Sequence, residues 1–169
     1  CTSSETIELL KSNKGDIGFV NLPIDDTEIN LSNTVMQLHD TFVCSDKFKE
    51  LTDGVVDLKR LQDYPLLMLE QNTATRQEFI SFTNSLGVDL TPEFELGSLE
   101  LCVEMAKSGL GIACVSREFV KDELNSGKLF EVKVEPALPV RAIGVILNKD
   151  KELNYTLSSF LKLLNENNN

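Results

Sequence analysis

The stretch GSLELCVEMAKSGLGIACVS, residues 97–116, decides how the chain is organised. Four apolar residues recur at helical spacing and share one face: Leu99, Cys102, Val103 and Ala106. Ser98 precedes them at the position of a helix cap. Gly109 and Gly111 then lead directly into an apolar segment that is typical of a buried strand. The stretch therefore predicts a helix, a tight corner and a strand, in that order.

The two glycines of this corner are interpreted as structural. In a dinucleotide-binding fingerprint, glycines follow a strand and open a helix, so that phosphates meet backbone amides. Here the order is reversed, and a phosphate at this corner would meet carbonyl groups. We therefore expect Gly109 to end the helix in a left-handed conformation and Gly111 to permit close approach of another backbone.

Helical and strand patterns alternate along the rest of the chain. Helices are expected at 2–11, 73–87, 98–108, 116–124 and 153–164. Strands are expected at 17–20, 29–45, 66–69, 91–96, 111–115, 127–132 and 140–147. The segment 29–45 is either one long strand or two joined by a bend, and 48–65 reads as a polar loop with a short helical turn. This alternation predicts an α/β fold with largely parallel sheets.

Two of the expected helices begin with a capping box, in which a hydroxyl and a carboxylate three residues later satisfy each other's backbone amides. Thr2 pairs in this way with Glu5, and Thr75 with Glu78. Gly87 supplies the stop of the second helix.

Composition limits the possible functions. The 169 residues carry a formal net charge of −11, which makes the chain by itself a poor nucleic-acid binder. No apolar run approaches the roughly 20 residues of a membrane span, and no signal-peptide pattern opens the sequence, so no membrane partner is expected. The four cysteines lack metal-site spacing and favour a reducing, cytoplasmic location. Cys102 and Cys114 lie in apolar segments and are expected to be structural.

No enzyme signature is present. The chain has one histidine, His39, which lies in an expected strand and is interpreted as structural. No nucleophile elbow, phosphate loop or zinc motif occurs, and the carboxylates are scattered along exposed helix faces. We therefore expect no catalytic residue, no metal and no cofactor, and we do not expect an enzyme.

Several segments, taken in order, resemble the effector-binding domain of LysR-type transcriptional regulators. They are TIELLKSNKGDIGFV, LKRLQDYPLLML, TRQEFISFTNSLGVDLTPEFELGSLE, ELCVEMAKSGLGIACVS followed by EL and GKL, and VRAIGVILNKD with LSSFLKLL. Each segment alone is weak evidence for the family, but their succession covers nearly the whole chain. One subgroup of the family senses peroxide through a cysteine near the start of the 75–87 helix. The segment QNTATRQEF has no cysteine there, so a sensor of that type is not expected.

The resemblance implies two Rossmann-like α/β lobes joined by two crossing strands, similar to a type II periplasmic binding protein. Lobe I would comprise residues 1–41 plus 142–169 and would be incomplete, because the first strand-helix-strand of the family is missing. Lobe II would comprise residues 42–141. The crossing strands would be HDTFVC and VRAIGV, and the family's winged helix-turn-helix is absent.

In the family, helix N-termini and hydroxyl side chains line an inter-lobe cleft that holds the effector. The amides of a helix's first turn favour negative charge, so a small anionic metabolite is the expected ligand. The positions that match are Thr2, Ser3, Asn72, Thr73, Ala74, Thr75, Gly97 and Ser98. By spacing alone these hydroxyl residues are simply helix caps. Asn21 is expected at the rim, and Arg76 is expected to face solvent or to be ion-paired.

The implied partners are a small-molecule effector, a second copy in a homodimer or homotetramer, and DNA only through the absent N-terminal domain. The family's antiparallel dimers imply the helices SSETIELLKS and SLELCVEMAKS as interface candidates, although each apolar stripe can equally face its own sheet. The alternative is a solute-binding lipoprotein of a transport system with the same bilobal fold. Cys1 would then be its first mature residue, but a capped helix follows at once where a flexible linker is expected.

Overall fold

The computed structural model describes residues 2–24, 26–149 and 154–166. The chain divides into two compact units. Unit 1 comprises residues 1–38 and 141–169, and unit 2 comprises residues 39–140. Whether these units correspond to the two expected lobes stays a prediction. Cys1 lies outside the described residues, and so does Leu153, where the last helix is expected to begin.

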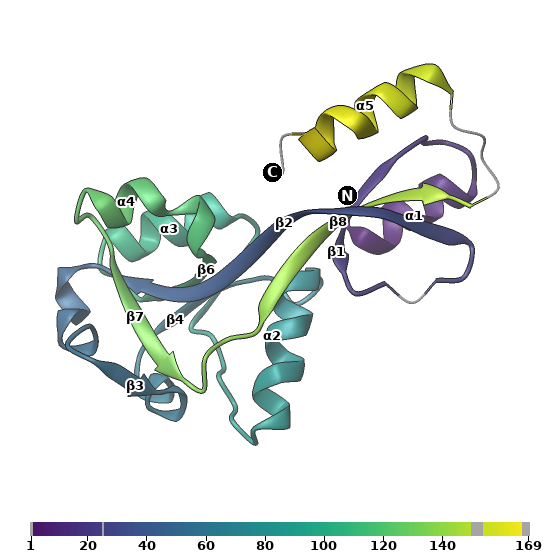
Figure 1. The fold of residues 1–169 in the computed structure, drawn as a ribbon. Helices are drawn as coiled ribbons and strands as arrows, with labels where there is room; N and C mark the ends of the chain where they lie inside the picture. The colour runs from purple at the N-terminus through teal and green to yellow at the C-terminus, as the bar shows by residue number, and fades with distance from the viewer. Residues whose placement is uncertain (1, 25, 150–153, 167–169) are drawn as a thin grey trace. The chain divides into compact units, whose positions relative to one another are not determined.

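Two long strands, β2 (Ile29–Cys44) and β8 (Val140–Asn148), contribute residues to both units (Figure 1). Unit 1 also contains α1 (Ser3–Lys11), β1 (Gly18–Leu22) and α5 (Tyr155–Glu166). Unit 2 contains the strands β3 (Val55–Asp57), β4 (Leu66–Leu69), β5 (Phe94–Leu96), β6 (Ile112–Ser116) and β7 (Phe130–Glu135). Its helices are α2 (Ala74–Ser85), α3 (Leu99–Lys107), α4 (Lys121–Asn125) and the 3-10 helices η1 (Asp46–Leu51), η2 (Leu58–Asp63) and η3 (Arg117–Phe119).

Unit 1 is built on β1 and β8, which pair antiparallel from Gly18 opposite Ile146 to Leu22 opposite Ala142. Helix α1 packs on β1 through a small buried cluster: Leu10, Val20, Ile29 and Ile146. Because Gly18 has no side chain, the methyl groups of α1 can approach β1 closely. The sheet therefore holds the start of α1 in a fixed place relative to the end of β1.

In unit 2, β4 lies between β5 and β6 and is parallel to both. Strand β2 enters this sheet antiparallel to β6 and β7, and β3 pairs parallel with β7. The expectation of largely parallel sheets is therefore wrong, and the sheets are mixed. The long strands β2 and β8 cause the difference, because β8 pairs antiparallel with β1 and β2 pairs antiparallel with β6 and β7.

Helices cover both faces of the unit 2 sheet (Figure 1). On one face α3 buries Cys102, Val103 and Ala106, the apolar stripe that its sequence predicts. On the other face α2 contributes Phe79, whose ring meets Phe42 of β2 edge-on at a centroid distance of 6.0 Å. The sheet is thus sandwiched between two apolar layers, which fixes the position of both helices.

The corner between α3 and β6 has the expected geometry. Gly109 adopts a φ of +71°, which closes the helix in the left-handed region. A Cβ atom on Gly111 would lie 2.5 Å from the carbonyl oxygen of Pro65, which is closer than real Cβ atoms approach. Both interpretations of these glycines are therefore confirmed. The segment 29–44 is a single long strand, which settles the open alternative.

Two local expectations are only partly right. The segment 48–65, predicted as a polar loop with a short helical turn, does contain helical turns, the end of η1 and all of η2, but it also contains β3, because a three-residue strand is too short to show a pattern. The helix predicted over 116–124 is divided into η3 and α4. Val120, at the junction, is fully buried and has a non-helical backbone, so tertiary packing overrides the helical pattern there.

Replacing Gly111 by alanine is expected to destabilise the chain by about 2 kcal/mol, because the added methyl group must displace backbone rather than a flexible side chain. Gly54→Ala is the matched control, since a Cβ there meets nothing within 4 Å. Urea unfolding of both variants measures the difference. Equal free energies of unfolding for the two variants would contradict the close approach.

Two thiols are expected to be inert in the folded chain. Cys44 and Cys102 are fully buried, and burial raises the pKa of each thiol to about 11. Both thiols are therefore protonated at neutral pH, and the thiolate is the reactive form. Iodoacetamide treatment followed by peptide mass mapping should leave both unmodified until guanidinium unfolds the protein. Rapid labelling of either in the native chain would show that its segment opens.

Candidate functional site

The start of α1 uses the hydroxyl of Thr2 for capping. Thr2 Oγ1 accepts a hydrogen bond from the amide of Glu5, and the Thr2 amide donates to Glu5 Oε2 at 2.7 Å. This second bond lowers the pKa of Glu5. The predicted capping box is confirmed, and the Thr2 hydroxyl is therefore already engaged in holding the helix.

Ser3 is joined to a polar chain that extends to a buried arginine. Ser3 Oγ accepts a hydrogen bond from the amide of Asn21 at 3.1 Å, and Asn21 Oδ1 accepts one from Arg141 Nη1 at 2.8 Å. Arg141 is only 5% exposed. The structure thus brings together Ser3, Asn21 and a cation that the sequence analysis missed. The only signal was a charged residue within the otherwise apolar segment VRAIGVIL.

In unit 2, α2 begins with Thr73 and not with a capping box at Thr75. Thr73 Oγ1 accepts from the amide of Arg76 at 3.2 Å and donates to the carbonyl of Glu70 at 2.9 Å. The expected pairing of Thr75 with Glu78 is therefore wrong, because the helix starts two residues earlier than that pairing requires. Thr75 lies inside the first turn, half-buried.

Hydrogen-bond donors remain available at this helix start. Within the described part of the chain, neither the amides of Ala74 and Thr75 nor the Thr75 hydroxyl has a protein partner. Two free amides and one hydroxyl in the first turn of a helix are suited to binding an oxyanion. Asn72 precedes them and is exposed.

The start of α3 lies close to the segment that leads into α2. Ser98 caps α3 by accepting from the amide of Leu101, and Gly97 precedes it. The amide of Glu70 donates to the carbonyl of Leu96, and Glu70 Oε1 lies beside Gly97. Gly97 and Ser98 are thus brought near the 70–73 segment, but a carboxylate already occupies this position. The helix start of α3 is accordingly less suited to an anion than that of α2.

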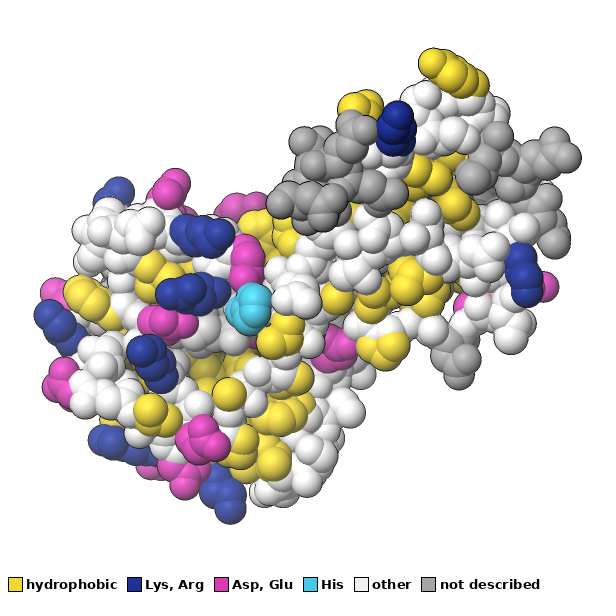
Figure 2. Space-filling model, in the orientation of Figure 1, with side chains coloured by type: hydrophobic (Ala, Val, Ile, Leu, Met, Phe, Trp, Pro, Cys, Tyr) yellow, Lys and Arg dark blue, Asp and Glu magenta, His cyan; other side chains and the backbone are white. Residues whose placement is uncertain are grey.

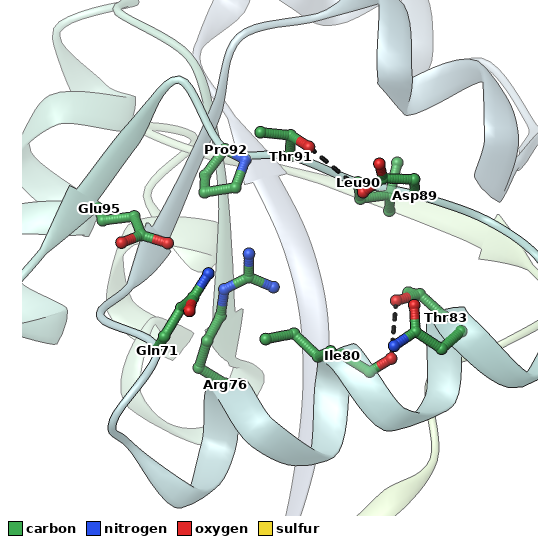
Figure 3. Close-up of a pocket in the computed structure, with 10 residues that line it drawn as sticks. Gln71, Arg76, Ile80, Thr83, Asp89, Leu90, Thr91, Pro92 and Glu95 are labelled. Carbon is green, nitrogen blue, oxygen red and sulfur yellow. Dashed lines mark hydrogen bonds between the residues drawn. The ribbon is translucent and has the colours of Figure 1, made fainter.

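Arg76 differs from its expectation. It is neither solvent-facing nor ion-paired within the described residues, and only 5% of it is exposed. Its guanidinium lies 5.5 Å from the ring centroid of Phe79 and lines a cavity of about 330 Å³. Figure 3 shows the side chain rising from α2 into this cavity, toward the loop with Thr91 and Pro92.

His39 has a structural partner. Its ring Nδ1 lies 2.7 Å from Glu118 Oε1, and its backbone amide donates to Glu118 Oε2 at 3.0 Å. Burial raises the pKa of Glu118, but the hydrogen bonds from His39 outweigh burial and leave the pKa lowered. Among the residues that the structure describes, no three His, Cys, Asp or Glu side chains group in a way that could hold a metal ion.

One face of unit 2 carries mixed charge. On the face that Figure 2 shows, the basic side chains of unit 2 are interspersed with acidic ones. On this face, the dispersed charges of both signs do not form the basic stripe that a duplex requires. In the described part of the chain, no helix combines the length and the apolar character that crossing a bilayer requires.

The sequence matches one family model over its full length. The model for the LysR substrate binding domain covers residues 1–169. An HTH-type transcriptional regulator of Escherichia coli, YeiE, is 29% identical over 163 residues, which span 94% of this chain and 54% of that protein. The transcriptional activator CmpR of Synechocystis is 25% identical over 160 residues, covering 95% of this chain and 52% of CmpR. The chain thus spans about half the length of these curated relatives.

Solved structures share the fold. The regulatory domain of CcmR from Synechocystis, in complex with 2-PG, has a TM-score of 0.86 at 18% identity and covers 99% of this chain and 80% of that one. The effector binding domain of QuiR, in complex with shikimate, has a TM-score of 0.82 at 12% identity, with coverage of 99% and 78%. These are LysR regulatory domains with the two-lobed fold of periplasmic binding proteins, which confirms the expected fold class. The chain belongs to the LysR family of transcriptional regulators and is an effector-binding domain of that family.

Proposed function

We propose that this chain senses a small organic anion and thereby controls the DNA binding of a cytoplasmic LysR-type regulator. The free donors at the start of α2 are the observation that carries the proposal. Two amides and the Thr75 hydroxyl have no partner within the described residues, and a helix N-terminus favours negative charge. A carboxylate or phosphate group would satisfy all three donors.

Unit 1 offers a second group that favours an anion. Arg141 is buried and donates to Asn21, whose backbone amide in turn donates to Ser3. A buried guanidinium attracts negative charge more strongly than an exposed one. The Ser3 hydroxyl accepts from Asn21 and keeps its own proton for donation. We predict that one effector contacts both groups of residues, in the inter-lobe cleft that the family implies.

The effector would act by binding two arrangements of the domain with different affinity. Such a difference in affinity shifts the population toward the arrangement that binds the effector more tightly. This shift can change how the DNA-binding domains of a homodimer or homotetramer are arranged. Helices α1 and α3 remain the proposed interface, and each has a leucine, Leu9 and Leu101, that is more than two-fifths exposed. A transport binding protein would share this fold, but the curated relatives are transcriptional regulators.

Removing the hydroxyl of Thr75 is expected to weaken effector binding about tenfold while leaving stability nearly unchanged, because one hydrogen bond to a charged group is lost. Thr75→Val keeps the side-chain shape, and Thr75→Ser keeps the hydroxyl and is the matched control. The effector is first found by thermal-shift screening of small organic anions, starting with 2-PG and shikimate. Isothermal titration then measures the Kd of each variant.

Equal affinity of Thr75→Val and the unmodified chain would remove the α2 start from the site. Thr73→Ala serves as a second control, since that hydroxyl caps α2 and its loss lowers helix stability by about 1 kcal/mol. If the neutral amide or ester of an effector binds as tightly as the anion itself, the proposed preference for negative charge is contradicted.

A further inference from the structure

The cavity at Arg76 lies within unit 2, between α2 and the segment that leads into β5 (Figure 3). Its volume is about 330 Å³, at the lower end of the range for small-molecule sites. Three apolar side chains contribute to its walls: Ile80, Leu90 and Pro92. Polar and charged side chains complete them: Gln71, Arg76, Thr83, Asn84, Asp89, Thr91 and Glu95.

Arg76 is the unusual member of this lining. The side chain is 5% exposed, and its Nε is fully buried without a hydrogen-bond acceptor. Within the described residues the guanidinium makes no hydrogen bond or ion pair, and its one contact of note is with the Phe79 ring. A guanidinium presents five N–H donors in a planar fork that fits a carboxylate. An unsatisfied buried cation of this kind is costly unless a ligand or water supplies acceptors.

Two carboxylates lie on other walls of the cavity. Asp89 and Glu95 are both exposed, and neither forms an ion pair with Arg76. Asp89 Oδ1 accepts a hydrogen bond from Thr91 at 3.2 Å, which holds it in place. Burial lowers the pKa of Arg76, whereas the charges of Glu95 and Asp89 raise it, and arginine remains protonated in proteins. The cavity therefore has a positive group at its buried wall and negative groups at its exposed walls.

We propose that this cavity binds a small zwitterion of the α-amino-acid class. Its carboxylate would pair with the Arg76 guanidinium, and its ammonium group would lie toward Glu95 and Asp89. A simple anion would be opposed by the two carboxylates, and a simple cation by the buried guanidinium. The apolar wall of Ile80, Leu90 and Pro92 would receive an aliphatic side chain.

This site is distinct from the proposed anion site at the start of α2. The backbone amide of Arg76 takes part in the Thr73 cap, but its guanidinium lies in the cavity on the side of the 89–95 segment. None of the cavity-lining residues is Thr75, Ala74, Ser3 or Arg141. Thr75 and Arg76 do line one small neighbouring hollow together, so variants at Glu95, which lines only the cavity, distinguish the two sites.

The experiment screens the L-α-amino acids by thermal shift on the 169-residue chain and then titrates the best ligand into the ¹⁵N-labelled protein. We expect at least one aliphatic amino acid to raise the Tm and to shift amide signals of residues 71–95. Its N-acetyl derivative and its carboxamide should each bind about tenfold more weakly, since each lacks one charged group. Arg76→Lys should weaken binding about tenfold, because a lysine cannot reproduce the bidentate fork.

Substitutions at exposed residues keep the test valid if changes at Arg76 disturb folding. Glu95→Gln should weaken binding of the amino acid about threefold. Glu93→Gln, on the same segment but outside the cavity lining, should leave the Kd of the amino acid unchanged. An N-acetyl derivative that binds as tightly as the free amino acid would overturn the zwitterion proposal. No response to any amino acid, or amide shifts confined to residues outside 71–95, would overturn the site itself.

Discussion

The contact between Gly111 and the carbonyl of Pro65 sets the arrangement of unit 2. The amide of Ile112 donates to Pro65 O at 2.9 Å, so β6 pairs with β4 from its first residue. Strand β4 in turn pairs with β5, and Leu69 and Leu96 end opposite each other. Because parallel strands end at the same edge of a sheet, the chain leaves both at one place. The starts of α2 and α3, which follow β4 and β5, are therefore neighbours.

The sequence predicts those features that depend on neighbours in the chain. The stripe of α3, the capping box of Thr2 and the left-handed Gly109 each involve residues within a few positions of one another, and all are confirmed. Whether α2 starts at Thr73 or uses Thr75 could not be decided from spacing, because both threonines are followed by acceptable helix residues. The packing of the segment from β4, through the carbonyl of Glu70, selects Thr73.

Buried arginines lie beyond what the sequence could predict. Arg141 is held by Asn21, which is 120 positions away, and Arg76 lines a cavity together with residues of the 89–95 segment. Neither burial leaves a local pattern, since arginine is mostly exposed in proteins. Both residues are also the ones that we propose to pair with the negative group of a ligand. Much of the candidate site's chemistry therefore depends on tertiary contacts, while its position depends on local ones.

The two threonines at the start of α2 differ in role, and this difference affects how the ligand specificity of such a domain can change. Thr73 holds the helix end, and Thr75 has a hydroxyl that the described protein does not use. If Thr75 contacts the effector as we propose, a change of side chain at position 75 would alter which compound is recognised without loosening the helix that presents the backbone amides. In the proposed site, ligand specificity and folding would be encoded in different residues, so selection could act on the first while leaving the second intact.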